Sequence, residues 1–323
     1  TFVREAVVQP SRDSSRPRSR GRFFFWTCAM PISHLLLTLA VVVVWGTNFV
    51  VIRYGLDEFP PLLFATLRFA FSLLPWVLVV KRPAVPWRHL AGNGLFLGFG
   101  MFGLLFIAMR ADITPGVASI MAQTQAFFTI GLAMLFLREH LHRYQGVGLA
   151  LCLAGLAVLF ANVDGTVTTR GLALTLAAGL CWAVANLIAK RAGKVDMLGF
   201  MVWSSLFAIP PLLACSLWLE GPQSVLAAVT AASWPAWAAA VWQGVANTLF
   251  GYGAWNWLLA RHPTAAIAPF SLLVPVVAIV SSVLLLDEAL PIWKIQAMAL
   301  LMSGLAVIAL WPKLRALRMN RSV

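Results

Sequence analysis

Ten apolar blocks of roughly membrane-spanning length follow one another along the sequence. Hydrophobic residues make up 61% of the 323 residues and charged residues only 11%, whereas about a quarter of a soluble domain is charged. A chain of this kind satisfies its backbone in a bilayer as helices of about 20 residues. We therefore expect an all-α integral membrane protein with ten transmembrane helices, at 33–53, 60–80, 90–109, 115–137, 144–161, 170–190, 198–219, 234–259, 264–286 and 291–311.

The basic residues predict how these helices are oriented. If the amino terminus is cytoplasmic, the cytoplasmic segments hold all 24 Lys and Arg residues except Arg53, Arg68, Arg110, Arg170 and Lys294. Lys and Arg are enriched in cytoplasmic loops, so both termini are predicted to be cytoplasmic. Because the charges are spread between apolar blocks, the net charge of +13 does not indicate nucleic-acid binding.

An internal repeat divides the chain. The segment 136–160 aligns with the segment 285–309 at an offset of 149, which matches Glu139 with Glu288 and Gly155 with Gly304. We expect a first five-helix repeat at 30–165 and a second at 166–312, between a basic, disordered extension at 1–29 and a basic cytoplasmic tail at 313–323. Because each copy has an odd number of spans, the two copies are predicted to be inverted around a central cavity. Inverted repeats favour alternating access, although channels with inverted repeats are also known.

Two strings resemble a known family. These are WGTNFVVIRYG at 45–55 and PPLLFATLRFAFSLLP at 60–75, and each half ends in GLAV. They resemble the EamA-type members of the drug/metabolite transporter superfamily, and within it the YddG-type exporters of aromatic amino acids. The resemblance implies a multi-pass protein of the bacterial inner membrane that exports aromatic and other apolar amino acids or related metabolites. An exporter of drugs or cationic metabolites and a passive solute channel are the alternatives.

Candidate substrate-binding residues are the polar side chains in mid-helix, which are costly in lipid and usually face a cavity or another helix, together with the indoles beside them. Amides can bind a zwitterion without fixed charge, and indoles suit an aromatic side chain. The alternative is that the amides only join helices. The candidates are Trp45, Asn48, Gln123, Gln125, Trp182, Asn186, Gln243, Asn247 and Trp255.

Arg68 and three prolines complete the residues of interest. Arg68 belongs to the family-like string, so we interpret it as structural, with contact to a substrate anion as the alternative. Pro75, Pro210 and Pro275 lie inside apolar blocks and are predicted hinges, because proline removes a helix hydrogen bond.

No Asp, Glu or His falls in the middle of an apolar block. A proton-coupled carrier usually needs such a group, so we expect transport down a gradient or by exchange. The alternatives are that a loop carboxylate, Asp57, Glu58 or Asp112, reaches the cavity mouth, or that the substrate itself carries the proton. The sequence also has no phosphate-binding loop, no metal-ligand spacing and no nucleophile paired with a base. We therefore expect no enzyme activity, no cofactor and no metal. The predicted partners are a small-molecule substrate and membrane lipid, without nucleic acid, and the protein is predicted to be a monomer or weak homodimer.

Overall fold

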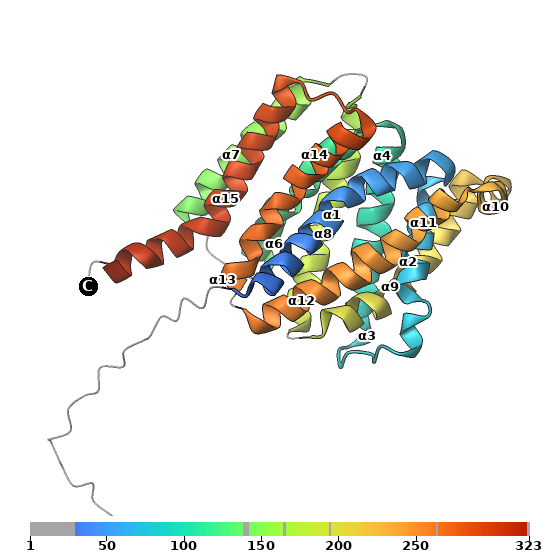
Figure 1. The fold of residues 1–323 in the computed structure, drawn as a ribbon, viewed down its shortest axis with the longest axis horizontal. Coiled ribbons are helices and arrows are strands. Elements are labelled where there is room, and N and C mark those ends of the chain that lie inside the picture. The colour runs from blue at the N-terminus through green and yellow to red at the C-terminus, as the bar shows by residue number, and fades with distance from the viewer. Residues whose placement is uncertain (1–29, 138–141, 164–165, 194, 263, 322–323) are drawn as a thin grey trace, which may run out of the picture.

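The computed structural model describes residues 30–137, 142–163, 166–193, 195–262 and 264–321. The expected extension at 1–29 therefore lies outside the described residues. Within them the chain is helical, with one isolated β-bridge between Ile113 and Val167. Over the same ranges, nine helices are long and apolar enough to cross a membrane, and a bent pair makes up to ten. All of the predicted spans correspond to helices of the structure, which form one bundle (Figure 1).

The first five spans are single or broken helices. Span 1 is α1 (Ile32–Glu58), and span 2 is α2 (Pro61–Leu73) followed by the 3₁₀ turn η1 (Trp76–Leu78). Span 3 comprises α3 (Trp87–Asn93), the π-helical η2 (Gly94–Phe102) and α4 (Gly103–Ala111). Span 4 comprises α5 (Pro115–Ala122) and α6 (Gln125–Leu137), and span 5 is α7 (Arg143–Ala161).

The last five spans follow the same plan. Span 6 is α8 (Thr169–Ala192), and span 7 joins α9 (Met197–Cys215) to the π-helical η3 (Ser216–Glu220). After α10 (Pro222–Ala231) the chain bends by 104° into span 8, made of α11 (Trp234–Trp242), the π-helical η4 (Gln243–Phe250) and α12 (Gly251–Arg261). Span 9 comprises α13 (Thr264–Ile267), the 3₁₀ segment η5 (Ala268–Leu273) and α14 (Val274–Leu286). Span 10 is α15 (Ile292–Arg321), which continues ten residues beyond the predicted end of the tenth block.

Irregular segments occur at matching places in the two halves. The π-helical segments η2 and η4 begin at Gly94 and Gln243, which are 149 residues apart, the offset of the sequence repeat. Span 4 is interrupted between α5 and α6, and span 9 contains η5 at the corresponding place. The predicted hinge residues differ: Pro75 follows α2, Pro210 lies inside α9, and Pro275 is in the first turn of α14.

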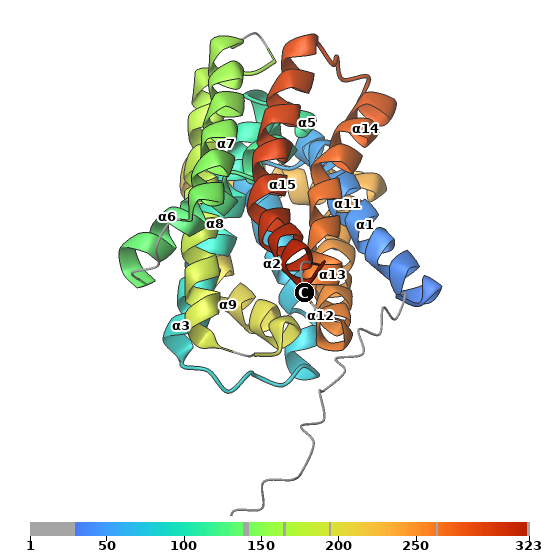
Figure 2. The same ribbon diagram turned by 90° about the vertical axis from the view of Figure 1, so that its left-hand side faces the viewer.

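Helices α7 and α15 pack side by side at one edge of the bundle, as Figures 1 and 2 show. The close approach of the two helix backbones depends on glycine, because a Cβ on Gly304 would lie 2.5 Å from the carbonyl oxygen of Gly148. A Cβ on Gly155 would lie 2.9 Å from the carbonyl oxygen of Ala297. Small residues at such contacts let two backbones approach closely.

At one end of the bundle, carboxylates of the first half bind helix starts of the second half. Glu58, at the end of α1, accepts hydrogen bonds from the Ser233 N–H at 2.6 Å and from its hydroxyl at 2.5 Å, directly before α11. Asp112, after α4, accepts from the Thr168 hydroxyl at 2.8 Å, directly before α8. Carboxylates are favourable at these positions because a helix N-terminus has unpaired N–H groups and partial positive charge.

Two carboxylates of the second half make the reciprocal contacts. Glu220 accepts from the N–H groups of Leu62 at 2.6 Å and Leu63 at 3.1 Å, in the first turn of α2. Glu288 accepts from the N–H of Gly116 at 3.0 Å, in the first turn of α5. Four carboxylates thus join the two halves at this end of the bundle. We call them the bridging carboxylates: Glu58, Asp112, Glu220 and Glu288.

Glu288 is a largely buried member of this set, with a side chain that is 7% exposed. Burial alone would raise the pKa of Glu288, but hydrogen bonds from Ser282, Thr114 and the Gly116 N–H, together with Lys294 at 3.0 Å, outweigh it and lower the pKa. The side chain is therefore a carboxylate at neutral pH.

The glycine contact predicts opposite effects for two similar substitutions. We expect Gly304→Ala to destabilise the protein by about 1–3 kcal/mol, because the added methyl group overlaps the backbone of α7. Gly131→Ala, on α6, meets nothing within 4 Å and should be neutral or stabilising by up to about 1 kcal/mol through helix propensity. Thermal unfolding of the two purified variants tests this, and equal melting temperatures would contradict the packing described here.

Candidate functional site

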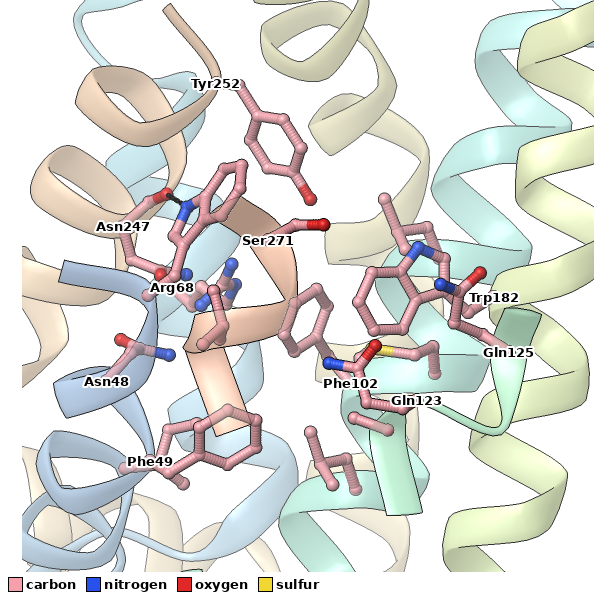
Figure 3. Close-up of a pocket in the computed structure, with 17 residues that line it drawn as sticks. Asn48, Phe49, Arg68, Phe102, Gln123, Gln125, Trp182, Asn247, Tyr252 and Ser271 are labelled. Atoms are coloured by element: carbon pink, nitrogen blue, oxygen red, sulfur yellow. Dashed lines mark hydrogen bonds between the residues drawn. The ribbon is translucent and has the colours of Figure 1, made fainter. Parts of the chain in front are cut away.

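A cavity of about 200 Å³ lies inside the bundle between the two halves. Spans 1, 2, 3 and 4 contribute to its wall from the first half, and spans 6, 8 and 9 from the second. Figure 3 shows Asn48, Arg68 and Asn247 on one side of it and Gln123, Gln125 and Trp182 on the other. Its lining residues are Trp45, Asn48, Phe49, Ile52, Arg68, Leu97, Met101, Phe102, Leu105, Ala122, Gln123, Gln125, Trp182, Asn247, Tyr252, Ser271 and Val274.

Most of the residues that the sequence singles out come together at this cavity. Six of the nine candidates line it: Trp45, Asn48, Gln123, Gln125, Trp182 and Asn247. Each of the other three lies behind a lining side chain. Trp255 packs against Trp45 with ring centroids 5.2 Å apart, Asn186 donates a hydrogen bond to Gln125, and Gln243 binds Arg68.

Gln243 is not a lining residue, but it contacts Arg68, which is. Arg68 Nη1 donates to the Gln243 side-chain oxygen, and both side chains are buried. This buried contact with Gln243 is what the sequence interpretation of Arg68 as a structural residue predicts. Arg68 also lines the cavity, as the alternative of contact with a substrate anion requires.

Neutral groups surround the guanidinium of Arg68. Nη2 donates to the Thr248 hydroxyl at 3.0 Å. With its amide oxygen turned toward the guanidinium, Asn247 accepts from Nη2 at 2.8 Å and from Nη1 at 2.9 Å. The ring of Phe102 lies against it, 3.8 Å from the guanidinium carbon to the ring centroid, which is a favourable cation–π contact.

Aromatic rings form a wall beside this polar group. Trp45 donates its indole N–H to the backbone oxygen of Asn247 at 3.1 Å, which fixes the ring across the two halves. The ring of Tyr252 is 5.6 Å from that of Trp45. Gly251 lies directly against the indole, because a Cβ there would be 2.3 Å from Trp45 Nε1. This position therefore requires glycine for Trp45 to keep its place.

The opposite wall is built at the interruption of span 4. The helix is broken between α5 and α6 at Gln123 and Thr124, so the Gln123 and Gln125 side chains both reach the cavity. Asn186 of α8 holds Gln125 by donating to its side-chain oxygen at 2.6 Å, and it also contacts the Thr129 hydroxyl at 3.3 Å. Interrupted helices of this kind often line substrate sites in transporters.

The sequence interpretation missed Phe49, Phe102, Tyr252 and Ser271. With α-helical spacing, Asn247 would share a face with Gly251 and Trp255, whereas η4 is π-helical. A π-helix bonds each residue to the fifth one along, and Asn247 and Tyr252, five residues apart, both line the cavity. Pro269, two residues before Ser271, was the available signal for the 3₁₀ segment that brings Ser271 to the wall.

A bundle of membrane-spanning helices with interrupted segments around an internal cavity defines a multi-pass membrane protein with an internal solute-sized site. The model of the EamA-like transporter family matches residues 32–161 and 169–310. The chain belongs to this family.

Two relatives agree with this assignment. The chain is 40% identical over 277 residues to a probable amino-acid metabolite efflux pump of Salmonella typhimurium, covering 84% of this chain and 93% of the relative. It is 39% identical over 278 residues to the protein of the same description in Escherichia coli, with the same coverage. A crystal structure with 20% identity shares the fold, with a TM-score of 0.55 over 87% of this chain and 97% of the matched chain.

The surroundings of Gln243 predict that it stabilises the bundle. We expect Gln243→Ala to cost about 1–3 kcal/mol, because Arg68 loses a buried acceptor. Asn256→Ala is a matched control further along the same span, since the amide nitrogen of Asn256 is buried without a partner. Melting temperatures of both variants test the difference. Wild-type stability of Gln243→Ala would show that this contact contributes nothing to folding.

Proposed function

We propose that the protein exports aromatic and other apolar amino acids, or closely related small metabolites, from the cytoplasm. The observation that carries this proposal is the composition of the cavity wall, which combines aromatic rings and neutral amides with one cation, Arg68. A zwitterion with an apolar side chain matches each of these groups, because amides satisfy its polar end and indoles contact its side chain. The description of the Salmonella and Escherichia relatives as amino-acid metabolite efflux pumps supports the same substrate class.

The alternatives fit the cavity less well. A cationic metabolite or drug would meet the positive charge of Arg68, and no Asp or Glu is among the lining residues. The volume of about 200 Å³ is also below the roughly 300–1,000 Å³ of pockets for drug-sized ligands. A passive channel is the alternative of a different class, and it is distinguished by kinetics.

We infer that transport uses alternating access between two inverted halves. The contacts of α7 with α15 support this inference. Gly148 faces Gly304, and Gly155 faces Ala297, while the repeat offset of 149 relates 148 to 297 and 155 to 304. Each contact is therefore the symmetry mate of the other, which is the pattern of a two-fold axis. Because the two helices are antiparallel, such an axis lies in the membrane plane.

We also propose that the chain lies in the bacterial inner membrane with both termini cytoplasmic, and the distribution of basic residues supports this orientation. The end with the bridging carboxylates then faces the outside. We expect a membrane-impermeant thiol reagent applied to intact cells to label a cysteine introduced at Gln223, but not one introduced at Ala84, in a background without native cysteines. Both positions are exposed; Gln223 is in α10 and Ala84 precedes α3, and Figure 1 shows α10 and α3 at different ends of the bundle. The reverse labelling pattern would refute the orientation.

Transport is proposed to run down the substrate gradient or by exchange. The lining residues include neither a carboxylate nor an imidazole, and amides and indoles do not titrate near neutral pH. Arg68 keeps its proton at accessible pH. A proton gradient imposed on liposomes with equal substrate on both sides should then cause no net accumulation.

Liposomes containing the purified protein test the function. We expect labelled L-phenylalanine to enter them faster when unlabelled L-phenylalanine is trapped inside, with saturation at high concentration, because a carrier returns through its loaded states. L-Phenylalanine should be preferred over a lipophilic cationic drug. A rate that rises linearly with concentration and ignores trapped substrate would identify a channel, and preference for the cation would support the drug exporter.

A further inference from the structure

Arg68 is a buried cation that no carboxylate of the described chain neutralises. The side chain is 1% exposed, and no Asp or Glu of the described residues lies within ion-pair distance of it. Taking an uncompensated charge out of water is costly, so buried charges are normally paired. Arginine also keeps its charge where a lysine or histidine would lose a proton. The described part of the protein therefore does not itself supply the counter-charge of this site.

Hydrogen bonds hold the guanidinium in place without neutralising it. Gln243, Thr248 and Asn247 accept from its two Nη atoms, and all three are neutral. The Nε atom is buried and has no partner. One donor of Arg68 is thus still available, and the three acceptors that orient the group all belong to one π-helical segment, η4.

The position of Asn247 indicates where an anion would bind. Its side-chain oxygen accepts from both Nη atoms, at 2.8 and 2.9 Å, and Asn247 is also a lining residue. An oxygen that accepts from both Nη atoms marks a position at which a carboxylate oxygen would form charge-assisted hydrogen bonds with the guanidinium. Figure 3 shows Arg68 and Asn247 side by side at the cavity, facing the aromatic side chains.

We propose that Arg68 is the carboxylate-binding residue of the cavity, and that Gln243 and Thr248 are positioning residues that hold its guanidinium. This proposal rests on the proposed function and assigns the α-carboxylate of the exported amino acid to Arg68. The carboxylate displaces the amide oxygen of Asn247 and supplies the counter-charge that the surrounding side chains do not. The aromatic side chain of the substrate then lies toward Trp45 and Phe102.

Binding of four phenyl compounds to the wild-type protein tests the proposal. L-Phenylalanine and 3-phenylpropionate carry a carboxylate, whereas L-phenylalaninamide and phenethylamine do not. We expect the two carboxylates to raise the melting temperature of the purified protein, and the amide and the amine to need at least about tenfold higher concentration for the same shift. Equal stabilisation by all four compounds, or none by either carboxylate, would overturn the proposal.

Variants of Arg68 add an independent readout. Arg68→Gln should remove the preference for L-phenylalanine over L-phenylalaninamide, while Arg68→Lys should keep part of it, because lysine keeps the charge but loses the planar fork. Arg53→Gln is the matched control, since Arg53 pairs with Asp57 on the surface of α1. A preference that survives in Arg68→Gln would refute the assignment. If this variant does not fold, the comparison of compounds on the wild-type protein decides the question.

The two proposals can fail separately. If the carboxylates stabilise the protein through Arg68 but labelled L-phenylalanine is not transported in liposomes, the carboxylate site stands and the proposed function fails. If L-phenylalanine is transported but L-phenylalaninamide binds equally well, the function stands and the assignment of Arg68 fails.

Discussion

Hydrocarbon cannot satisfy a backbone N–H or C=O group, and the architecture of this protein follows from that constraint. A regular helix pairs these groups within itself and can face lipid anywhere along its length. An interrupted helix leaves some of these groups unpaired at the break. The break must therefore be covered by protein or face a cavity. The interruption of span 4, the π-helical segments η2 and η4, and the 3₁₀ segment η5 all contribute residues to the cavity. These segments bring Gln123, Asn247 and Ser271 to the cavity wall, whereas η1 and η3 contribute no lining residue.

A buried arginine imposes a second requirement on the same region. Its hydrogen-bond donors need acceptors when no ligand is bound, and Gln243, Thr248 and Asn247 provide them. Had one of these acceptors been a carboxylate, the ion pair would have closed the site to an anionic ligand. Neutral acceptors instead keep the guanidinium ordered and charged. The candidate amides therefore differ in position. Asn247 lines the cavity, whereas Gln243 does not and instead accepts a hydrogen bond from Arg68.

The sequence predicted the ten spans well because the length and apolarity of a membrane helix are local properties. It also predicted six lining residues, since Asn48 and Gln125, for example, carry amides that are costly to expose to lipid. It could not distinguish these from Gln243 or Asn186, because whether an amide reaches the cavity depends on which side chain stands in front of it. Tyr252 was missed because a π-helical turn changes the spacing of one face. The bridging carboxylates were beyond prediction because they join residues up to 175 positions apart through loop geometry.

The bridging carboxylates also determine how reversibly the halves can be joined at that end. Three of the carboxylates accept from backbone N–H groups at a helix start, and Asp112 accepts from the Thr168 hydroxyl. Breaking such a contact exchanges protein hydrogen bonds for hydration. Such an exchange has a net cost of only about 0.5–1.5 kcal/mol for a typical hydrogen bond, and more where a charge takes part. Apolar packing of the same area would leave hydrophobic surface in water each time it separated. Contacts made this way specify one alignment of the halves, and separating them would cost less free energy than separating an apolar interface of the same area.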